Sequence, residues 1–243
     1  MIFQTDSELL LAAIPIPIII CVLYFIIGLL FLRKFFTIEK GILQRESYFC
    51  FSLFFIFLGI GKFFAILFNF ILTQFNTDLF VQHSLWFRLT IVSDLIAYGF
   101  CIFIIEKFIF QGKTKNLFTL YISIFAIYCS FFQTLNNTSD FSLMLTFQQL
   151  GIMIPTLVIG IGYLVIFFKI PGKSSKRSSL MVVIGLLLVA IFPLIFLVMG
   201  GTESAIVVDI TSLNSFLVYL NHFKNITSSI LIAIGMIKLH IPK

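Results

Sequence analysis

Charged residues are scarce in this chain, and their scarcity excludes most soluble folds. Asp, Glu, Lys and Arg make up 11% of the 243 residues, whereas 60% are hydrophobic and 33 residues are phenylalanine. A soluble domain carries about 25% charged residues. A chain with a mean hydropathy of +1.14 is stable only with lipid as its solvent. We therefore expect a multi-pass protein of the cell membrane, with the lipid bilayer as its first partner.

The chain also lacks the spacings that mark metal sites and common hydrolases. Its four cysteines form no CxxC pair, and its three histidines show no metal-ligand spacing. No GxSxG, HExxH or paired-Asp motif is present. We accordingly predict no metal site and no catalytic residue, and we interpret the protein as a non-enzyme. The net charge of +6 does not indicate nucleic-acid binding, because the basic residues lie in short clusters between apolar segments.

Long apolar runs dominate the rest of the sequence, and a transmembrane helix needs about 20 such residues. We expect seven spans, at about residues 9–32, 47–72, 85–105, 117–134, 148–168, 180–200 and 213–237. Short connections between spans favour antiparallel neighbours. The fold prediction is therefore an all-α, polytopic membrane protein, a single seven-transmembrane-helix bundle over residues 1–243. The four cysteines fall inside apolar runs, so we expect buried thiols.

Basic residues occupy alternate connections and set the expected orientation. They follow the first, third, fifth and seventh spans, whereas the other connections and the N-terminal segment carry acidic residues and no Lys or Arg. The positive-inside rule then places the N-terminus outside and the C-terminus in the cytoplasm, which requires an odd number of spans. The basic residues are Arg33, Lys34, Lys40, Arg45, Lys107, Lys113, Lys115, Lys169, Lys173, Lys176, Arg177, Lys238 and Lys243.

Prolines and paired glycines punctuate several of the expected spans. Pro155 and Pro193 each remove an amide donor, so they indicate either ordinary kinks or a hinge around the fifth and sixth spans. Pro15 and Pro17 are expected to interrupt the first span in the same way. The glycines predict close helix approach and are Gly59, Gly61, Gly160 and Gly162.

Three of the expected spans each carry one charged residue at nearly the same depth. Lys62 lies about ten residues from the outer end of its span, Asp94 about nine and Lys224 about eleven. At about 1.5 Å per residue, all three fall roughly 13–17 Å below the outer surface, near the bilayer centre. A charge there costs at least ~3 kcal/mol on insertion scales, so such residues usually face the protein interior. We predict that these residues form a buried ligand-binding site.

Polar side chains recur at helical spacing beside two of these charges. Tyr98 follows Asp94 by four residues, and a stripe with three- and four-residue steps runs along the seventh span through Asn221, Lys224 and Asn225. A polar stripe on an apolar helix faces the bundle core or a wet cavity. Tyr98, Asn221 and Asn225 therefore join the predicted ligand-binding set.

The charge count leaves several interpretations of this cluster open. Asp94 forms an internal salt bridge with one lysine in the simplest of them. Because two lysines face one aspartate, the site otherwise carries surplus positive charge, which suits a carboxylate or a lipid headgroup, or holds one uncharged lysine. The first hypothesis for function is a receptor or sensor that binds a small molecule or lipid and signals through a separate cytoplasmic partner. A small transporter or channel is the alternative, and a structural subunit of a membrane complex is another.

Two known families share this topology with the expected fold. The outer N-terminus and seven spans resemble G-protein-coupled receptors, and Glu106-Lys107 ends the third span where those receptors carry an acidic-Arg motif. An aspartate on the third span and a lysine on the seventh resemble microbial rhodopsins. That resemblance implies a retinal Schiff base on Lys224 with Asp94 as its counter-ion. The surrounding Val92-Ser93-Asp94-Leu95 departs from the Arg-Tyr-x-x-Asp-Trp pattern of the rhodopsin family. The cofactor therefore stays unknown at this point.

Overall fold

The protein is seen in a computed structural model that describes residues 15–38, 43–74, 76–108, 110–132, 134–169, 172–198 and 212–238. These residues form helices and connecting turns, with no strand among them. The α-helices are α2 (Pro15–Thr37), α3 (Leu43–Ile66), α4 (Ser84–Phe108), α5 (Leu117–Ile127), α6 (Thr138–Lys169), α7 (Lys173–Val198) and α8 (Ser212–Lys238). The all-α prediction is confirmed for this part of the chain.

Two of the helices continue into short π-helical segments. The segment η1 (Leu67–Leu72) extends α3, and η3 (Tyr128–Phe132) extends α5. A single 3-10 turn, η2 (Thr77–Leu79), lies between η1 and α4. With these extensions, α3 and α5 end within two residues of the predicted spans. A π-helical turn widens the backbone ring, and such turns are frequent at functional sites.

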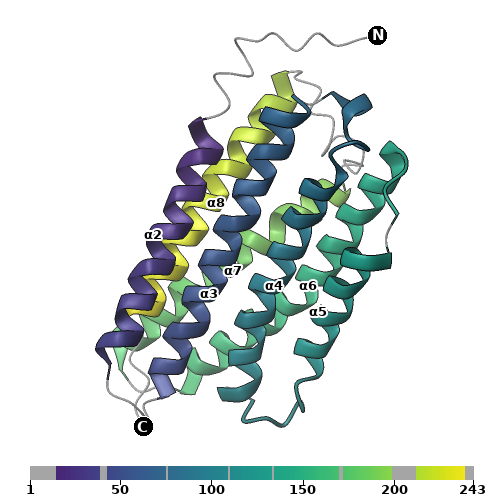
Figure 1. The fold of residues 1–243 in the computed structure, drawn as a ribbon. Helices are drawn as coiled ribbons and strands as arrows, with labels where there is room; N and C mark the ends of the chain where they lie inside the picture. Colours follow the sequence, from purple (N-terminus) through teal and green to yellow (C-terminus); the bar gives the residue numbers. More distant parts are fainter. Residues whose placement is uncertain are drawn as a thin grey trace.

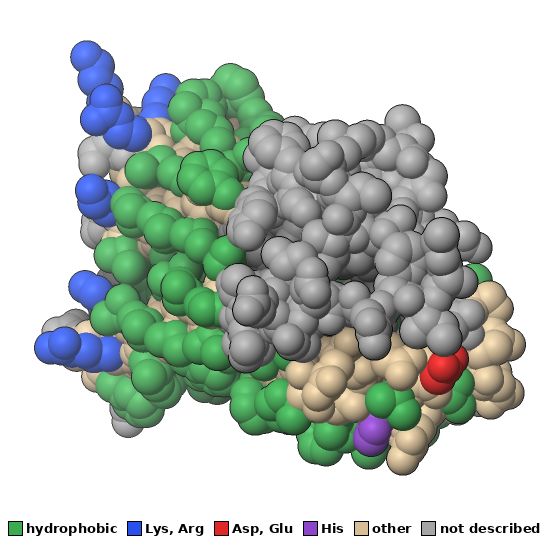
Figure 2. All heavy atoms as spheres, turned by 90° about the horizontal axis from the view of Figure 1, so that it is seen from above, with side chains coloured by type: hydrophobic (Ala, Val, Ile, Leu, Met, Phe, Trp, Pro, Cys, Tyr) green, Lys and Arg blue, Asp and Glu red, His purple; other side chains and the backbone are tan. Residues whose placement is uncertain are grey.

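Four of the described helical segments are long and apolar enough to cross a bilayer, by length and composition. They are Pro15–Thr37, Arg45–Leu72, Ser84–Lys107 and Ser139–Val165, and Leu117–Phe131 is a shorter apolar helix. Hydrophobic side chains dominate the described part of the face seen in Figure 2. Lys and Arg side chains gather along one edge of that face, and an acidic and a histidine side chain lie at the opposite edge. These features support a membrane protein.

Six helices form a closed ring, and α5 lies outside it. Each of α2, α3, α4, α6, α7 and α8 packs against the next in that order, and α8 returns to pack against α2. Helix α5 contacts α4 and α6 at the edge of the bundle (Figure 1). The helices around the ring therefore follow their order in the chain except that α5 is left out, so that α4 packs directly against α6.

The structure bears on two local predictions. Pro15 and Pro17, both predicted to interrupt the first span, lie at the start of the described part of α2, and the residues before them are outside the described chain. Helix α6 begins at Thr138, ten residues before the predicted start of the fifth span. The reason is a reciprocal cap. The Asp140 amide donates to Asn137 Oδ1 at 3.1 Å, and the Asn137 amide donates to Asp140 Oδ2 at 3.1 Å.

The glycines predicted to allow close helix approach have different surroundings in α3 and α6. A Cβ atom on Gly59 would lie 3.1 Å from the Phe25 ring, and one on Gly61 would lie 2.6 Å from Asp94 Oδ1, so both positions need glycine for the close approach. A Cβ atom on Gly160 would meet nothing within 4 Å among the described residues. The packing role predicted for Gly160 is therefore wrong. The four cysteines are buried free thiols, as predicted.

Candidate functional site

A cavity of about 220 Å³ lies inside the helical ring. Its described walls come from α2, α3, α4, α6 and α8, and neither α5 nor the described part of α7 contributes a lining side chain. The lining residues are Tyr24, Phe54, Phe55, Leu58, Lys62, Asp94, Tyr98, Gln148, Ile152, Met153, Thr156, Lys224, Asn225, Ser228, Ser229 and Ile232. Charged, polar and apolar side chains therefore share one partly open cavity.

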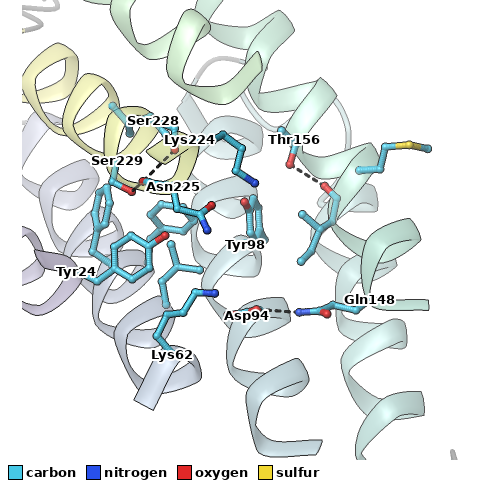
Figure 3. A pocket seen from close by; sticks show the side chains of 16 residues that line it. Tyr24, Lys62, Asp94, Tyr98, Gln148, Thr156, Lys224, Asn225, Ser228 and Ser229 are labelled. Carbon is cyan, nitrogen blue, oxygen red and sulfur yellow. Dashed lines mark hydrogen bonds between the residues drawn. The ribbon is translucent and has the colours of Figure 1, made fainter. Parts of the chain in front are cut away.

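The structure brings five of the six predicted site residues to this cavity. Lys62 approaches from α3, Asp94 and Tyr98 from α4, and Lys224 and Asn225 from α8 (Figure 3). Helices α3, α4 and α8 thus place their charges around one cavity. Asn221, the sixth predicted residue, lies on α8, but its side chain is outside those that the structure describes.

Asp94 is held in place by two neighbouring helices. Gln148 Nε2 on α6 donates a hydrogen bond to Asp94 Oδ2 at 2.8 Å. The other carboxylate oxygen lies against the backbone of α3 at Gly61, where no side chain intervenes. The Asp94 carboxylate is therefore fixed between α3 and α6.

Lys62 points toward Asp94, but the two do not form a direct ion pair (Figure 3). Among the described residues, no nitrogen–oxygen distance of 4.0 Å or less joins Lys62 to an acidic side chain, whereas Lys107 Nζ lies 2.7 Å from Glu46 Oε2. Lys62 attracts Asp94 and repels Lys224 across the cavity. The cluster is therefore not the closed salt bridge that the simplest sequence interpretation describes.

Helix α8 supplies the most polar wall of the cavity. Lys224 is buried, with 9% of its surface exposed, and Ser228 and Ser229 are almost fully buried beside it. The Ser229 hydroxyl donates to the Asn225 backbone oxygen at 2.6 Å, so the hydroxyl bonds within its own helix. The Asn225 amide group, by contrast, extends into the cavity (Figure 3). The wall combines a long cation with short neutral donors and acceptors.

The predicted ligand-binding set missed five polar lining residues, Tyr24, Gln148, Thr156, Ser228 and Ser229. They are uncharged, and Tyr24 and Thr156 lie on helices without a polar stripe. Gln148 was the first residue of the predicted fifth span, so it was assigned to the membrane edge. The cap formed by Asn137 and Asp140 is the sequence signal that would have moved the helix start outward and placed Gln148 inside the bundle.

The α6 wall surrounds a proline. Pro155 lies inside α6, between the lining residues Met153 and Thr156. Its ring removes the amide hydrogen that would otherwise bond the Gly151 carbonyl oxygen one turn earlier. Thr156 Oγ1 donates instead to the Ile152 backbone oxygen at 2.8 Å. This segment of the cavity wall has fewer backbone hydrogen bonds than a regular helix, which makes it the natural place for α6 to bend.

Two further charged residues, the buried Glu106 and the partly buried Arg88, lie outside the cavity and have structural partners. The Glu106 carboxylate accepts hydrogen bonds from the Phe118 and Thr119 amides at 3.0 and 2.8 Å, so it caps the start of α5. Arg88 donates to the Cys129 and Ser130 backbone oxygens at 3.0 and 2.8 Å, which are carbonyls of the π-helical turn η3. The acidic-basic pair noted at Glu106-Lys107 thus holds helix ends in place.

The cavity brings charged, neutral polar and apolar side chains together. Two lysines, one aspartate and neutral hydrogen-bonding groups face the same space, and apolar side chains complete the walls. No group of three or more His, Cys, Asp or Glu side chains within the described ranges is arranged to hold a metal ion. Polar groups that converge in an otherwise apolar pocket are typical of small-ligand sites.

Comparison with protein-family models gave no match, and searches among curated proteins and solved structures gave none either.

Proposed function

We propose that this chain is a seven-helix, receptor-like membrane protein whose central cavity binds a small molecule. Binding changes the packing of the helices around the cavity, and a separate cytoplasmic partner reads that change. The N-terminus lies outside, and the C-terminus lies in the cytoplasm. The one observation that carries this proposal is the cavity itself, in which Lys62, Asp94 and Lys224 meet inside an apolar bundle.

The cost of burying charge supports a ligand-binding role. An ionised side chain far from water needs several compensating contacts. Gln148 donates a hydrogen bond to Asp94, and Lys62 makes no ion pair with a described acid. A purely structural cluster would close onto itself, as Glu106 does with the start of α5. An open polar cavity is better accounted for by a ligand.

The seven-span topology is supported by helix lengths and by the distribution of charge. Helices α7 and α8 have 26 and 27 residues, which is long enough to cross a bilayer beside the four apolar segments. Apart from Lys62, Arg88 and Lys224, the basic residues of the described chain lie near one set of helix termini. These are the ends of α2, α4, α6 and α8 and the starts of α3, α5 and α7. A basic end of this kind faces the cytoplasm.

Cysteine labelling tests the orientation. We expect Gln82→Cys, on the exposed turn before α4, to react with a membrane-impermeant maleimide in intact cells, and Lys113→Cys to react only after permeabilisation. The native cysteines are buried and provide a low background. Reaction of both variants from outside would contradict the proposed topology.

A matched pair of serine variants tests ligand binding. Ser229 and Ser123 each donate to the backbone oxygen four residues earlier, but only Ser229 lines the cavity. The purified chain in nanodiscs is screened against a library of small metabolites by thermal unfolding. We expect compounds that stabilise the wild type and the Ser123→Leu variant but not Ser229→Leu, whose added side chain fills the cavity. Ligand binding in the cavity is refuted if no compound distinguishes the two variants.

A small transporter is the second candidate, and the proline in the α6 wall favours it. A helix that bends beside a midplane site is the arrangement that alternating access needs. Flux of a bound compound into proteoliposomes would establish this alternative, whereas binding without flux supports the receptor. The retinal hypothesis is not carried forward, because Asn225, Ser228 and Ser229 make the wall beside Lys224 polar.

A further inference from the structure

Resting on the proposed ligand-binding function, we propose that the cavity takes a small monoanion, a short-chain carboxylate held between Lys62 and Lys224. The two lysines come from α3 and α8, on different sides of the cavity, and both side chains extend into it (Figure 3). A carboxylate placed between them accepts charge-assisted hydrogen bonds from both ammonium groups.

The charge count selects an anion over a cation or a zwitterion. The described lining residues include two lysines and one aspartate, so with all three ionised they carry a formal charge of +1. A monoanion brings that sum to zero. A zwitterion would leave it unchanged, and a cation would double it. Net charge is costly inside an apolar bundle, so the neutralising ligand is favoured.

The position of Asp94 explains why the protein's own acid does not take the ligand's place. Gln148 holds one carboxylate oxygen at 2.8 Å, and the other rests against the backbone at Gly61. The carboxylate is thereby kept out of ion-pair distance of Lys62 in the described structure. Gln148 therefore acts as a positioning residue, because it keeps the Lys62 ammonium group available to the ligand.

The size and the apolar walls of the cavity define the rest of the ligand. Its volume of about 220 Å³ lies below the roughly 300–1,000 Å³ of pockets for drug-sized molecules. Leu58, Ile152 and Ile232 contribute apolar surface. A short alkyl chain fits both features. A free carboxylic acid and the carboxylate of a membrane fatty acid share this chemistry, and chain length distinguishes these two sources.

The first test uses the wild-type chain in nanodiscs and needs no variant. Its thermal unfolding is followed through Trp86 at constant ionic strength, with sodium butyrate, butyramide, butylammonium or 4-aminobutyrate added. We expect butyrate to raise the unfolding temperature in a saturable way and the other three compounds to have no effect. A stronger effect of the amide, the amine or the amino acid overturns the anion proposal but leaves a small-molecule site intact. No effect of butyrate at any concentration also overturns it, and the library screen then decides the proposed function separately.

Charge variants provide the second test. We expect Lys62→Gln and Lys224→Gln each to weaken butyrate binding about tenfold or more, and Asp94→Asn to leave it unchanged or tighten it. Lys113→Gln removes an exposed lysine on the loop before α5 and serves as the matched control with unchanged affinity. Loss of binding in Asp94→Asn together with retention in both lysine variants would assign the ligand a positive charge and refute the proposal.

The source of the carboxylate is decided by a chain-length series. Acetate, butyrate, octanoate and oleate are compared on the wild-type chain, with oleate incorporated into the nanodisc bilayer. We expect the affinity to peak at butyrate or octanoate. A continuous rise to oleate would identify a membrane fatty acid as the ligand and would contradict the short-chain assignment.

Discussion

Helix α4 carries two carboxylates with opposite surroundings, the partly buried Asp94 in its middle and the buried Glu106 near its end. Glu106 is fully buried and accepts two amide hydrogen bonds and one hydroxyl hydrogen bond from Phe118 and Thr119. Asp94 accepts a hydrogen bond from Gln148 and faces a cavity with two lysines. The difference shows that burial alone does not indicate function, because the number of fixed partners decides how much bonding capacity is left for a ligand.

The satisfied acid has a simple physical origin. The first amides of a helix have no partner within it, and they carry the positive end of the helix dipole. Asn116, the residue before α5, has a left-handed backbone (φ 59°) and makes no side-chain cap. The Glu106 carboxylate takes over this role from a neighbouring helix. It thereby fixes α5 against α4.

The largest effect is expected from breaking the Glu106 cap. Glu106→Leu leaves the Phe118 and Thr119 amides without their acceptor, which is expected to destabilise the protein by about 3 kcal/mol. Thermal unfolding of the purified chain measures the loss. Butyrate binding by the remaining folded fraction is expected to stay unchanged, since Glu106 does not line the cavity. A stable Glu106→Leu variant with altered butyrate binding would contradict the assignment of a structural role to Glu106 and a ligand-site role to Asp94.

A pair of glycine variants sharpens the comparison at Asp94. Gly61→Ala places a Cβ atom 2.6 Å from Asp94 Oδ1 and 3.3 Å from the Thr90 backbone oxygen, so the carboxylate or the helix must shift. We expect a loss of about 2 kcal/mol from this overpacking. Gly160→Ala meets nothing within 4 Å and is expected to raise stability by up to about 1 kcal/mol through helix propensity. Equal effects at both sites would show that α3 does not confine Asp94.

Releasing Asp94 from α6 is expected to have a smaller effect on stability. Gln148→Leu removes one hydrogen bond to a carboxylate, with an expected loss of about 1 kcal/mol. Its effect on binding is the more informative measurement. The freed carboxylate is expected to approach Lys62 and weaken butyrate binding, and the double variant Gln148→Leu/Asp94→Asn is expected to recover it. Failure of the second substitution to restore affinity would mean that Gln148 contacts the ligand itself.

The smallest effect is expected from an exposed acid with a single partner. Glu46 and Lys107 form an ion pair at 2.7 Å, with side chains 58% and 46% exposed. Solvent and salt screen such a pair, so Glu46→Gln is expected to change stability by less than about 0.5 kcal/mol. A double-mutant cycle with Lys107→Gln isolates the pair. A coupling energy as large as the Glu106 effect would contradict the ranking by burial and partner number.

The depth of the charged residues could be predicted from the sequence, whereas their partners could not. Counting residues from the apolar ends placed Lys62, Asp94 and Lys224 at one level, and the cavity contains all three. The expected partner of Asp94 was a lysine, but the hydrogen-bond donor is Gln148 on α6. The position of a residue along a helix gives its expected depth in the bilayer. It does not give the rotation of that helix or the helices that pack against it.

The neutral side chains of the site show the same limit. Tyr24 lies on a helix whose middle is otherwise apolar, and Thr156 lies on α6 two turns beyond Gln148 with mostly apolar residues between them. A helix in lipid need not turn its apolar side inward, because lipid tails accept apolar residues on all faces. The hydrophobic pattern therefore gives a weak signal for which face of α2 or α6 lines the cavity.

The sequence by itself determined the all-α class of the described chain, the approximate ends of most helices, the buried thiols and the set of three charges that line the cavity. These follow from local composition, since backbone groups in an apolar chain must be satisfied within each helix. The tertiary structure decided that α5 lies outside the ring, that α8 closes it against α2, and that Asp94 is held by Gln148 and Gly61. Those outcomes depend on close packing between helices, and packing is a property of the assembled side chains rather than of any single segment.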